Sequence, residues 1–318
     1  MPDLEESIRS IVEPDSQTDP TFRSTRIYTT LTAKEVRRRL NADFGFKKKD
    51  LPCRKTISTL MNKLGYVIRQ VQKSKPIKKV PETDEIFETI RPLNKQADSD
   101  PGVLRISIDA KAALNIGEFS RGGKSRLGPK AYDHDFDPEY KHIPYGLFIP
   151  QTNESWVWFA QSSVTSDFIV DRLEEIWPAL KKKFKNPHTL VINLDNGPEC
   201  SGLRTQWLKR MVEFSDKTGV RVRLAYYPPY HSKYNPIERF WGVLENYWNG
   251  EIIDSIQKAM GLVRSMTYNK VKPMVSKVKK LYKKGVTLTK KQMKTVEKRL
   301  ERKPGLPKWF IDIDPIAR

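Results

Sequence analysis

The segment TLVINLD, Thr189–Asp195, is an apolar stretch that ends in an aspartate followed by Asn-Gly. A short apolar run that stops at turn residues is typical of a strand buried on both faces of a sheet. Asp195 begins the turn signal DNG, so the strand is expected to end there. A second stretch of the same kind, VLRISID at 103–109, also ends in an aspartate, Asp109. These two stretches predict two central strands.

Strand and helix patterns alternate on either side of these two strands, over residues 103–249. The remaining predicted elements are a hairpin of 143–150 and 155–163, helices at 167–184 and 203–219, a strand at 220–227 and a helix opened by Asn235. The order strand, hairpin, helix, strand, helix, strand, helix indicates an α/β domain with a mixed sheet.

Three carboxylates fall at chemically suggestive places in this pattern. Asp109 and Asp195 follow strands, and ligands in α/β sheets bind at the carboxyl ends of strands. Glu238 begins the helix after the last strand, in the sequence NPIE. Each carboxylate alone has a structural explanation, as a turn residue or as part of a cap built by Asn235 and Pro236. If the two strands are neighbours, all three predict one acidic pocket.

Three carboxylates in one pocket repel each other unless a cation is bound. Oxygen ligands without sulfur or a histidine cluster favour Mg²⁺ or Mn²⁺ over zinc. Such a set can hold two ions about 3.5–4 Å apart, which activate the attacking oxygen and stabilise the leaving oxygen of a phosphodiester. The predicted catalytic residues and metal ligands are therefore Asp109, Asp195 and Glu238. Glu245, seven residues after Glu238, is the alternative third carboxylate.

The charge of the chain indicates the substrate class. The chain has 318 residues, 58 Lys+Arg and 38 Asp+Glu, with a net charge of +20 and a pI of about 9.7. Residues 261–318 alone carry a net +13. Solubility needs a net charge of only about 2–8, so a polyanionic partner, double-stranded DNA, is favoured over a merely soluble surface.

Other features exclude several classes. Cys53 and Cys200 are the only cysteines, and with four histidines they make neither a disulfide framework nor a structural zinc site. No apolar run has membrane-spanning length, and the acidic N-terminal segment is not a signal peptide. A cytoplasmic protein, associated with the prokaryotic nucleoid, is expected.

Residues 1–73 are predicted to form a small all-α helix-turn-helix domain that binds DNA. Thr32 and Glu35 cap the first helix, and the second begins at Pro52 and stops at Gly65. The polar face of the second helix has side chains of the types that contact phosphates and base edges, namely Arg54, Lys55, Ser58, Thr59, Asn62 and Lys63. Any small helical hairpin has a similar pattern, so the charge of the chain decides for DNA.

The rest of the chain is divided by composition. Residues 74–101 are proline-spaced and charged and are predicted to be a linker. The predicted catalytic domain spans residues 102–250. Residues 251–318 are predicted to be a basic helical C-terminal region that binds the DNA backbone. In that region Thr289 and Gln292 predict a helix start. Further predicted DNA contacts are Lys124 and Arg126 in a glycine-rich loop, and His231 and Lys233, for which an exposed turn is an equal alternative.

The order of elements, with aspartate, aspartate and glutamate at these places, resembles the ribonuclease-H-like core of DDE transposases. PPYHSKYNPIERFW (228–241) is similar to the strand exit and helix start of insertion-sequence and mariner-type transposases. RISIDAKAALNIGEFSRGG, DHDFDPEYKHIPYG and LVINLDNGPECSG are similar to the ISAzo-type, or Rhodopirellula-type, branch. The resemblance assigns the three metal-ligand roles to Asp109, Asp195 and Glu238.

The resemblance implies a Mg²⁺-dependent transposase that binds transposon terminal repeats, cleaves them and joins the 3′-hydroxyl to target DNA. Pairing of two ends implies a homodimer or a larger assembly. Two alternatives remain open: a nuclease of the same fold that only hydrolyses, and a catalytically silent DNA-binding regulator. The presence of all three carboxylates weighs against the regulator, and strand-transfer products would exclude the pure nuclease.

Overall fold

The structure is a computed structural model in which residues 3–13, 16–18, 27–29, 31–66, 80–118 and 140–316 are described. The chain forms two compact units, Met1–Lys75 and Pro76–Arg318. Lys124 and Arg126 lie outside the described residues.

The first unit contains three helices, α1 (Asp3–Val12), α2 (Ala33–Ala42) and α3 (Arg54–Lys63). The Thr32 side chain accepts a hydrogen bond from the Glu35 amide at the start of α2, which confirms this predicted cap. Helix α1, which the sequence pattern did not single out, buries Leu4, Ile8, Ile11 and Val12 in a core shared with α2 and α3. The unit is not wholly helical, because the short strands β1 (Ser16–Thr18) and β2 (Ile27–Thr29) pair antiparallel.

The predicted linker is wrong over most of its length, because helix α4 spans Thr83–Ser99. Ile86, Ile90 and Ala97 are buried and belong to the main core of the second unit. Pro92 lies inside this helix. Prolines and charges made the segment similar to a linker, but the spacing of its apolar residues places one face of a helix against the sheet.

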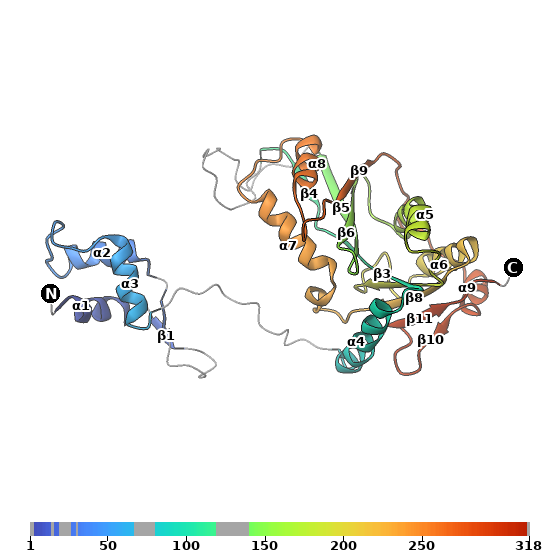
Figure 1. Ribbon diagram of the computed structural model, residues 1–318, viewed down its shortest axis with the longest axis horizontal. Helices are drawn as coiled ribbons and strands as arrows, with labels where there is room; N and C mark the ends of the chain where they lie inside the picture. Colours follow the sequence, from blue (N-terminus) through green and yellow to red (C-terminus); the bar gives the residue numbers. More distant parts are fainter. Residues whose placement is uncertain are drawn as a thin grey trace. The chain divides into compact units, whose positions relative to one another are not determined.

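The core of the second unit is a mixed sheet (Figure 1) with the strand order β10-β11-β8-β7-β3-β5-β6-β9, while β4 pairs with β5. Its strands are β3 (Val103–Ala110), β4 (Leu114–Ile116), β5 (Tyr140–Ile149), β6 (Glu154–Ala160), β7 (Thr189–Leu194), β8 (Arg221–Tyr226), β9 (Met274–Val278), β10 (Glu301–Arg302) and β11 (Phe310–Ile313). Strand β7 lies between β3 and β8 and is parallel to both, and β5 and β6 form the predicted hairpin. The predicted mixed α/β sheet is therefore confirmed.

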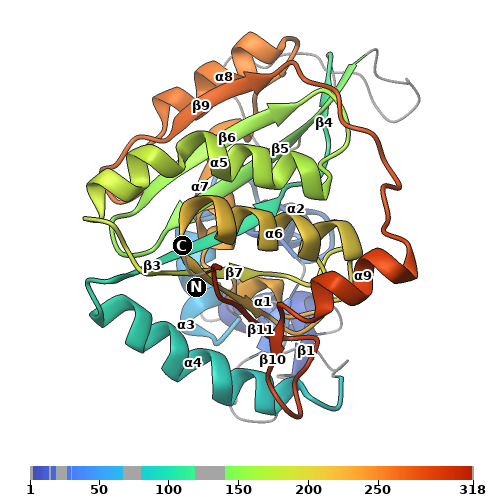
Figure 2. The same ribbon diagram turned by 90° about the vertical axis from the view of Figure 1, so that its right-hand side faces the viewer.

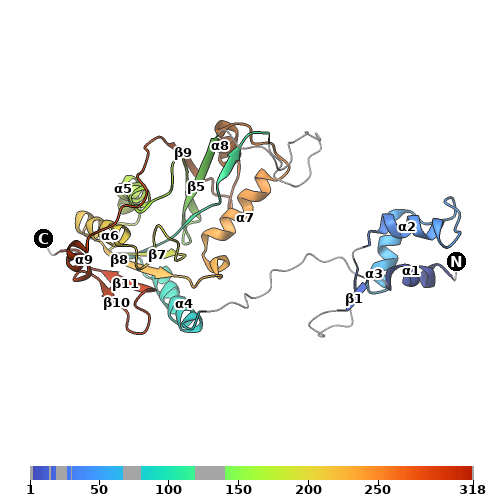
Figure 3. The same cartoon turned by 180° about the vertical axis from the view of Figure 1, so that it is seen from behind.

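Two layers of helices cover the sheet. Helices α5 (Ser166–Lys183) and α6 (Thr205–Thr218) lie on one face, and α7 (Ile237–Trp248) lies on the other (Figures 2 and 3). Side chains of β5 alternate between the layers: Leu147 belongs to the core that includes α5 and α6, and Phe148 to the core that includes α7. None of the described helices is long and apolar enough to cross a membrane.

The C-terminal region is not a separate helical tail but completes the sheet. Strand β9 pairs with β6 and β11 pairs with β8, so this region supplies strands at both edges. Basic residues made it similar to a DNA-binding helix, yet Phe310, Ile311 and Ile313 are buried in the core. It also contains α8 (Ile256–Ser265) and α9 (Lys290–Glu297), and α9 begins with the predicted cap of Thr289 and Gln292.

Candidate active site

The sheet brings the two strand-end aspartates together. Strands β3 and β7 pair in parallel, with Ser107 opposite Asn193. Asp109 and Asp195 lie two residues further along these strands. They are therefore side by side at the same end of two neighbouring strands. This adjacency is the condition on which the predicted acidic pocket depended.

A set of buried hydrogen bonds ties the start of α7 to β3. The Ser107 hydroxyl donates to Asn235 Oδ1 at 2.5 Å and accepts from the Ile237 amide at 3.0 Å. The Asn235 side-chain amide donates to the Ile108 carbonyl at 3.1 Å. Asn235 thus bonds to the strand instead of capping α7 with its side chain, which corrects the predicted cap. Pro236 precedes α7 with no side-chain cap, and Glu238 lies in the first turn.

Close packing at Gly146 fixes α7 over the sheet. Gly146 lies opposite Asp109 in the β3–β5 register. A Cβ atom on Gly146 would lie 2.6 Å from the Trp241 ring and 2.7 Å from the Ile237 side chain. Trp241 is buried and donates its indole N–H to Asp109 Oδ2 at 3.1 Å. The contact explains how one turn of α7 both packs on the sheet and orients a strand-end carboxylate.

Burial and mutual repulsion dominate the electrostatics of these carboxylates. Burial, followed by the charges of Asp195 and Glu238, raises the pKa of Asp109 to about 8. Burial and the charge of Glu238 also raise the pKa of Asp195, against a hydrogen bond from the Gly197 amide at 3.3 Å. Asp109, Asp195 and Glu238 are each half-buried and act electrostatically as one cluster.

Asp109 and Asp195 line a pocket of about 230 Å³. The pocket is lined by Ile108, Asp109, Ala110, Tyr145, Val164, Ile169, Asp195, Gly197, Pro198, Glu199 and Cys200. Glu238 acts on it through its charge and is not among the lining residues. Glu199, which the sequence analysis missed, adds a third lining carboxylate. Its position in the sequence, four residues after Asp195 and in the same loop, could have identified it.

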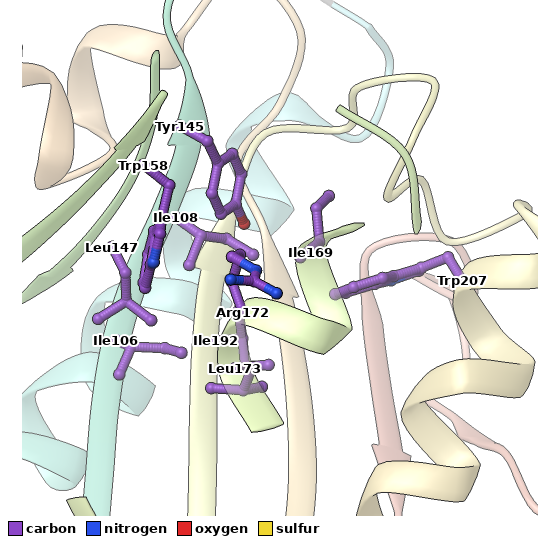
Figure 4. Close-up of a pocket in the computed structure, with 10 residues that line it drawn as sticks. All are labelled: Ile106, Ile108, Tyr145, Leu147, Trp158, Ile169, Arg172, Leu173, Ile192 and Trp207. Carbon is purple, nitrogen blue, oxygen red and sulfur yellow. The ribbon is translucent and has the colours of Figure 1, made fainter. Parts of the chain in front are cut away.

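A smaller cavity of about 10 Å³ adjoins this pocket and is lined by side chains of the sheet, of α5 and of Trp207 in α6 (Figure 4). Ile108, Tyr145 and Ile169 line both spaces. The buried Tyr145 hydroxyl has no hydrogen-bond partner among the described residues. Burial is the main reason why the pKa of Tyr145 is raised, and the nearby thiol and carboxylates raise it further. The Tyr145 hydroxyl is therefore neutral in the lining of the acidic pocket.

The donor chemistry of the cluster fits a divalent cation. Three carboxylates are hard oxygen donors, and a cation would offset the repulsion that raises the pKa of Asp109. Within the described ranges, however, no group of three or more His, Cys, Asp or Glu side chains is already arranged around a common metal position. The cluster therefore has suitable ligands without a closed coordination shell.

The predicted DNA-binding residues of α3 lie on its outer face. Arg54, Lys55, Thr59, Asn62 and Lys63 are exposed and Ser58 is half-buried, whereas Ile57 and Met61 point into the core. This division matches the amphipathic pattern of the sequence.

The remaining predicted site residues near α7 are His231, Lys233 and Glu245, and their environments differ. His231 is buried, its Nδ1 lies 2.8 Å from the Pro229 carbonyl, and its ring packs on Phe87 and Tyr234. The His231 ring therefore does not lie on the surface, where the predicted phosphate contact and the alternative exposed turn would both require it. Lys233 is exposed. Glu245 forms an ion pair with Lys111 at 2.7 Å.

The fold and the site define an α/β protein with an acidic pocket at the carboxyl ends of parallel strands. A family model described as the Rhodopirellula transposase DDE domain matches residues 7–315, and the chain belongs to this family of transposases. No curated protein matches the chain.

Solved structures of transposases and an integrase are similar to the chain at low identity. A Mos1 transposase paired-end complex with left transposon end has 11% identity and a TM-score of 0.43, over 80% of this chain and 68% of that one. A Mos1 mariner paired end complex with Mn has 11% identity and a TM-score of 0.44, over the same shares. The HTLV-2 integrase catalytic core domain in complex with magnesium has 17% identity and a TM-score of 0.28, over 52% of this chain and 88% of that one.

Proposed function

We propose that the chain is a DNA transposase that binds the terminal repeats of its own element and cleaves and joins DNA strands at Asp109, Asp195 and Glu238. Family membership supports the reaction class. The observation that carries the residue assignment is the parallel pairing of β3 and β7, which places Asp109 and Asp195 side by side, with Glu238 near enough for its charge to raise the pKa of Asp109. Such repulsion costs stability, and carboxylates with perturbed pKa values in a pocket are typical of active sites.

The same three carboxylates are the proposed ligands of two Mg²⁺ or Mn²⁺ ions. Such ions, when bound, activate a water or 3′-hydroxyl nucleophile and stabilise the leaving oxygen of a phosphodiester. The chain's own contribution is to hold the carboxylates in place. Trp241 fixes one oxygen of Asp109, the Gly197 amide orients Asp195, and the bonds between Ser107 and the start of α7 set the position of Glu238.

The proposed DNA-binding surface of the first unit is the exposed face of α3, used as the recognition helix of a helix-turn-helix domain. Support comes from the residue types on that face and from the net charge of +20. The second unit is proposed to be a ribonuclease-H-like core whose basic C-terminal residues contact the DNA backbone. Synapsis of two transposon ends then requires at least a homodimer.

Cleavage of terminal-repeat DNA from the source element in Mg²⁺ tests this function. Glu238→Gln keeps the size of the side chain and removes its charge, and is expected to lower the cleavage rate by about 10² or more, with folding and DNA binding retained. Glu301→Gln, at a side chain that is 75% exposed and outside the pocket, is the matched control and is expected to cut at the wild-type rate. Equal rates for wild type and Glu238→Gln would remove Glu238 from the site.

The products separate the proposed function from its two alternatives. A transposase gives cleaved ends that are joined to a second DNA molecule. Cleaved ends without joined products would indicate a hydrolytic nuclease. Specific binding of the ends with no cleavage in either Mg²⁺ or Mn²⁺ would indicate a regulator.

A further inference from the structure

A second pocket, of about 330 Å³, lies next to the carboxylate pocket and has a different character. Val164, Pro198 and Glu199 line both pockets, so the two spaces meet along the loop after Asp195. The second pocket is lined by Ser163, Val164, Thr165, Ser166, Asp167, Pro198, Glu199, Arg204, Gln206, Lys283, Lys284, Gly285 and Val286. Its cationic residues come from a chain segment far away in sequence.

The segment that carries Lys283 and Lys284 is fixed at both ends. On one side, Tyr282 is buried, its amide donates to Ser162 Oγ at 3.2 Å, and its hydroxyl donates to Asp171 at 2.8 Å. On the other side, the Val286 carbonyl accepts from Arg204 at 3.0 Å. Two adjacent lysines are thus held over a cavity by anchors that do not use their charges.

The anchoring continues one step further, at the start of α6. The Leu288 amide donates to Thr205 Oγ1 at 3.1 Å, which joins the segment to the first residue of that helix. Arg204 precedes α6 without making a side-chain cap. Arg204 and Gln206 line the pocket, so the start of α6, which carries the positive end of the helix dipole, borders it.

The charges at this pocket favour an anion. Lys283 and Lys284 are exposed and make no ion pair with any described residue, and Arg204 bonds only to a neutral carbonyl there. The two acidic lining residues do not cancel these cations. Asp167 accepts hydrogen bonds from Gln206 at 2.8 Å and Arg210 at 3.0 Å. Glu199 lies at the boundary and also lines the carboxylate pocket.

We propose that Lys283, Lys284 and Arg204, with the uncapped start of α6, form a phosphodiester-binding subsite that holds the DNA backbone beside the carboxylate pocket. The inference rests on the proposed function and adds where the substrate strand runs. The acidic pocket repels phosphate when no cation is present, so a cationic subsite next to it retains the strand from the side. The strand would pass the loop of Pro198 and Glu199 between the two pockets.

Salt dependence of DNA binding by the full-length chain tests the subsite. Lys283→Ala/Lys284→Ala is compared with wild type on a blunt duplex of arbitrary sequence. The plot of log affinity against log salt concentration is expected to become less steep by roughly 1 for each lysine that contacts a phosphate. Lys181→Ala/Lys182→Ala is the matched control, because it removes the same charge from exposed lysines at the opposite end of α5. The control is expected to keep the wild-type slope.

Single neutral methylphosphonate linkages, scanned along the cut strand of terminal-repeat DNA from the source element, then locate the contact. Wild type is expected to lose affinity at one or two linkages where Lys283→Ala/Lys284→Ala loses none. A wild-type slope and a wild-type linkage profile in that variant, with wild-type cleavage intact, would overturn the subsite and leave the transposase function standing. A site for free phosphate alone gives this same result. Failure of wild type to bind and cut DNA would overturn both.

Discussion

The Ser107 hydroxyl accepts a hydrogen bond from the Ile237 amide at 3.0 Å and so joins β3 to α7 in the interior of the protein. Ser107 precedes Asp109 by two residues on β3, and Ile237 precedes Glu238 directly. One buried bond therefore sets the relative position of two proposed metal ligands that are far apart in sequence. Asn235 adds two more bonds to the same strand.

Ser107→Ala is expected to lower the free energy of unfolding by about 1–3 kcal/mol, because it leaves the buried Ile237 amide and the Asn235 oxygen without a partner. Cleavage is expected to fall by more than the loss of folded protein explains, since only the bond from Asn235 to the Ile108 carbonyl would still hold the start of α7 and with it Glu238. Urea unfolding and single-turnover cleavage measure the two effects. Ser99→Ala, at an exposed position of α4, is the control and should change stability by less than about 0.5 kcal/mol. Full cleavage by folded Ser107→Ala would contradict the positioning role.

Two glycines give a second pair of variants. Gly146→Ala would place a Cβ atom 2.6 Å from Trp241 and 2.7 Å from Ile237, so α7 must move away from the sheet. We expect a loss of about 1–3 kcal/mol in the free energy of unfolding and a loss of cleavage. Gly242→Ala, adjacent to Trp241 on α7, meets no atom within 4 Å and should be neutral or stabilising by about 0.5–1 kcal/mol. Thermal unfolding of both variants checks this difference, and a tolerated Gly146→Ala would refute the close packing.

Much of the central sheet could be predicted because its strands are short apolar runs that end at turns. The predicted strands 189–195 and 103–109 match β7 (Thr189–Leu194) and β3 (Val103–Ala110) to within one residue at their ends, since burial on both faces leaves a strong pattern. The α4 segment and the C-terminal strands could not be assigned to the core in the same way. The apolar residues of α4 are interspersed with charged residues and a proline, and those of the C-terminal strands lie in a segment rich in lysine and arginine, so composition favoured a linker and a basic tail.

The types of the proposed site residues, and the position of the two aspartates at strand ends, could be predicted from the sequence. The adjacency of β3 and β7 was a condition in the sequence argument, and the structure satisfies it. The roles of Ser107, Gly146 and Trp241 could not be read from sequence, because each depends on a contact between segments that are distant along the chain. Asn235 was misassigned as a cap for the same reason. Its side chain bonds across to β3 rather than to its own helix.

Stability of the metal-free protein should depend on pH through Asp109. Its carboxyl has a pKa of about 8 in the folded state, raised by burial and by Asp195 and Glu238, whereas an unfolded aspartate has a pKa of about 3.9. Between these pH values the folded state binds the extra proton, so the free energy of unfolding falls as the pH rises. In EDTA, Asp109→Asn should lose part of this dependence and be more stable than wild type near about pH 8, by at least about 1 kcal/mol. Asp254→Asn, exposed, should follow wild type.

Divalent cations should stabilise the folded chain through the same residues. A ligand that binds only the folded state raises the free energy of unfolding in proportion to the logarithm of its concentration. Mg²⁺ or Mn²⁺ is therefore expected to raise the Tm of wild type and to raise it less for Asp109→Asn and Asp195→Asn. Differential scanning calorimetry with Ca²⁺-free buffers and an EDTA reference gives the shift. The same Tm increase in all three proteins would place the ions elsewhere.

Removal of helix α4 tests whether this helix is part of the second unit. The Arg105 guanidinium is almost fully buried, and it donates to Asp98 at 2.6 and 2.7 Å and to Asn193 at 2.9 Å. A fragment of residues 102–318 leaves this cation without its carboxylate and exposes the sheet surface that Ile86 and Ile90 cover. Breaking a buried pair costs about 3–5 kcal/mol when one partner is lost, which is a large part of the stability of one domain.

The fragment 102–318 is therefore expected to lack a cooperative unfolding transition, whereas 80–318 should have one. Asp98→Ala in the full chain isolates the ion pair from the packing. It should cost about 1–3 kcal/mol, less than a fully buried pair, because the Asp98 side chain is 40% exposed. Circular dichroism during urea unfolding measures all three. A cooperative transition of equal stability in both fragments would contradict this prediction, because it would show that α4 contributes nothing to the stability of the core.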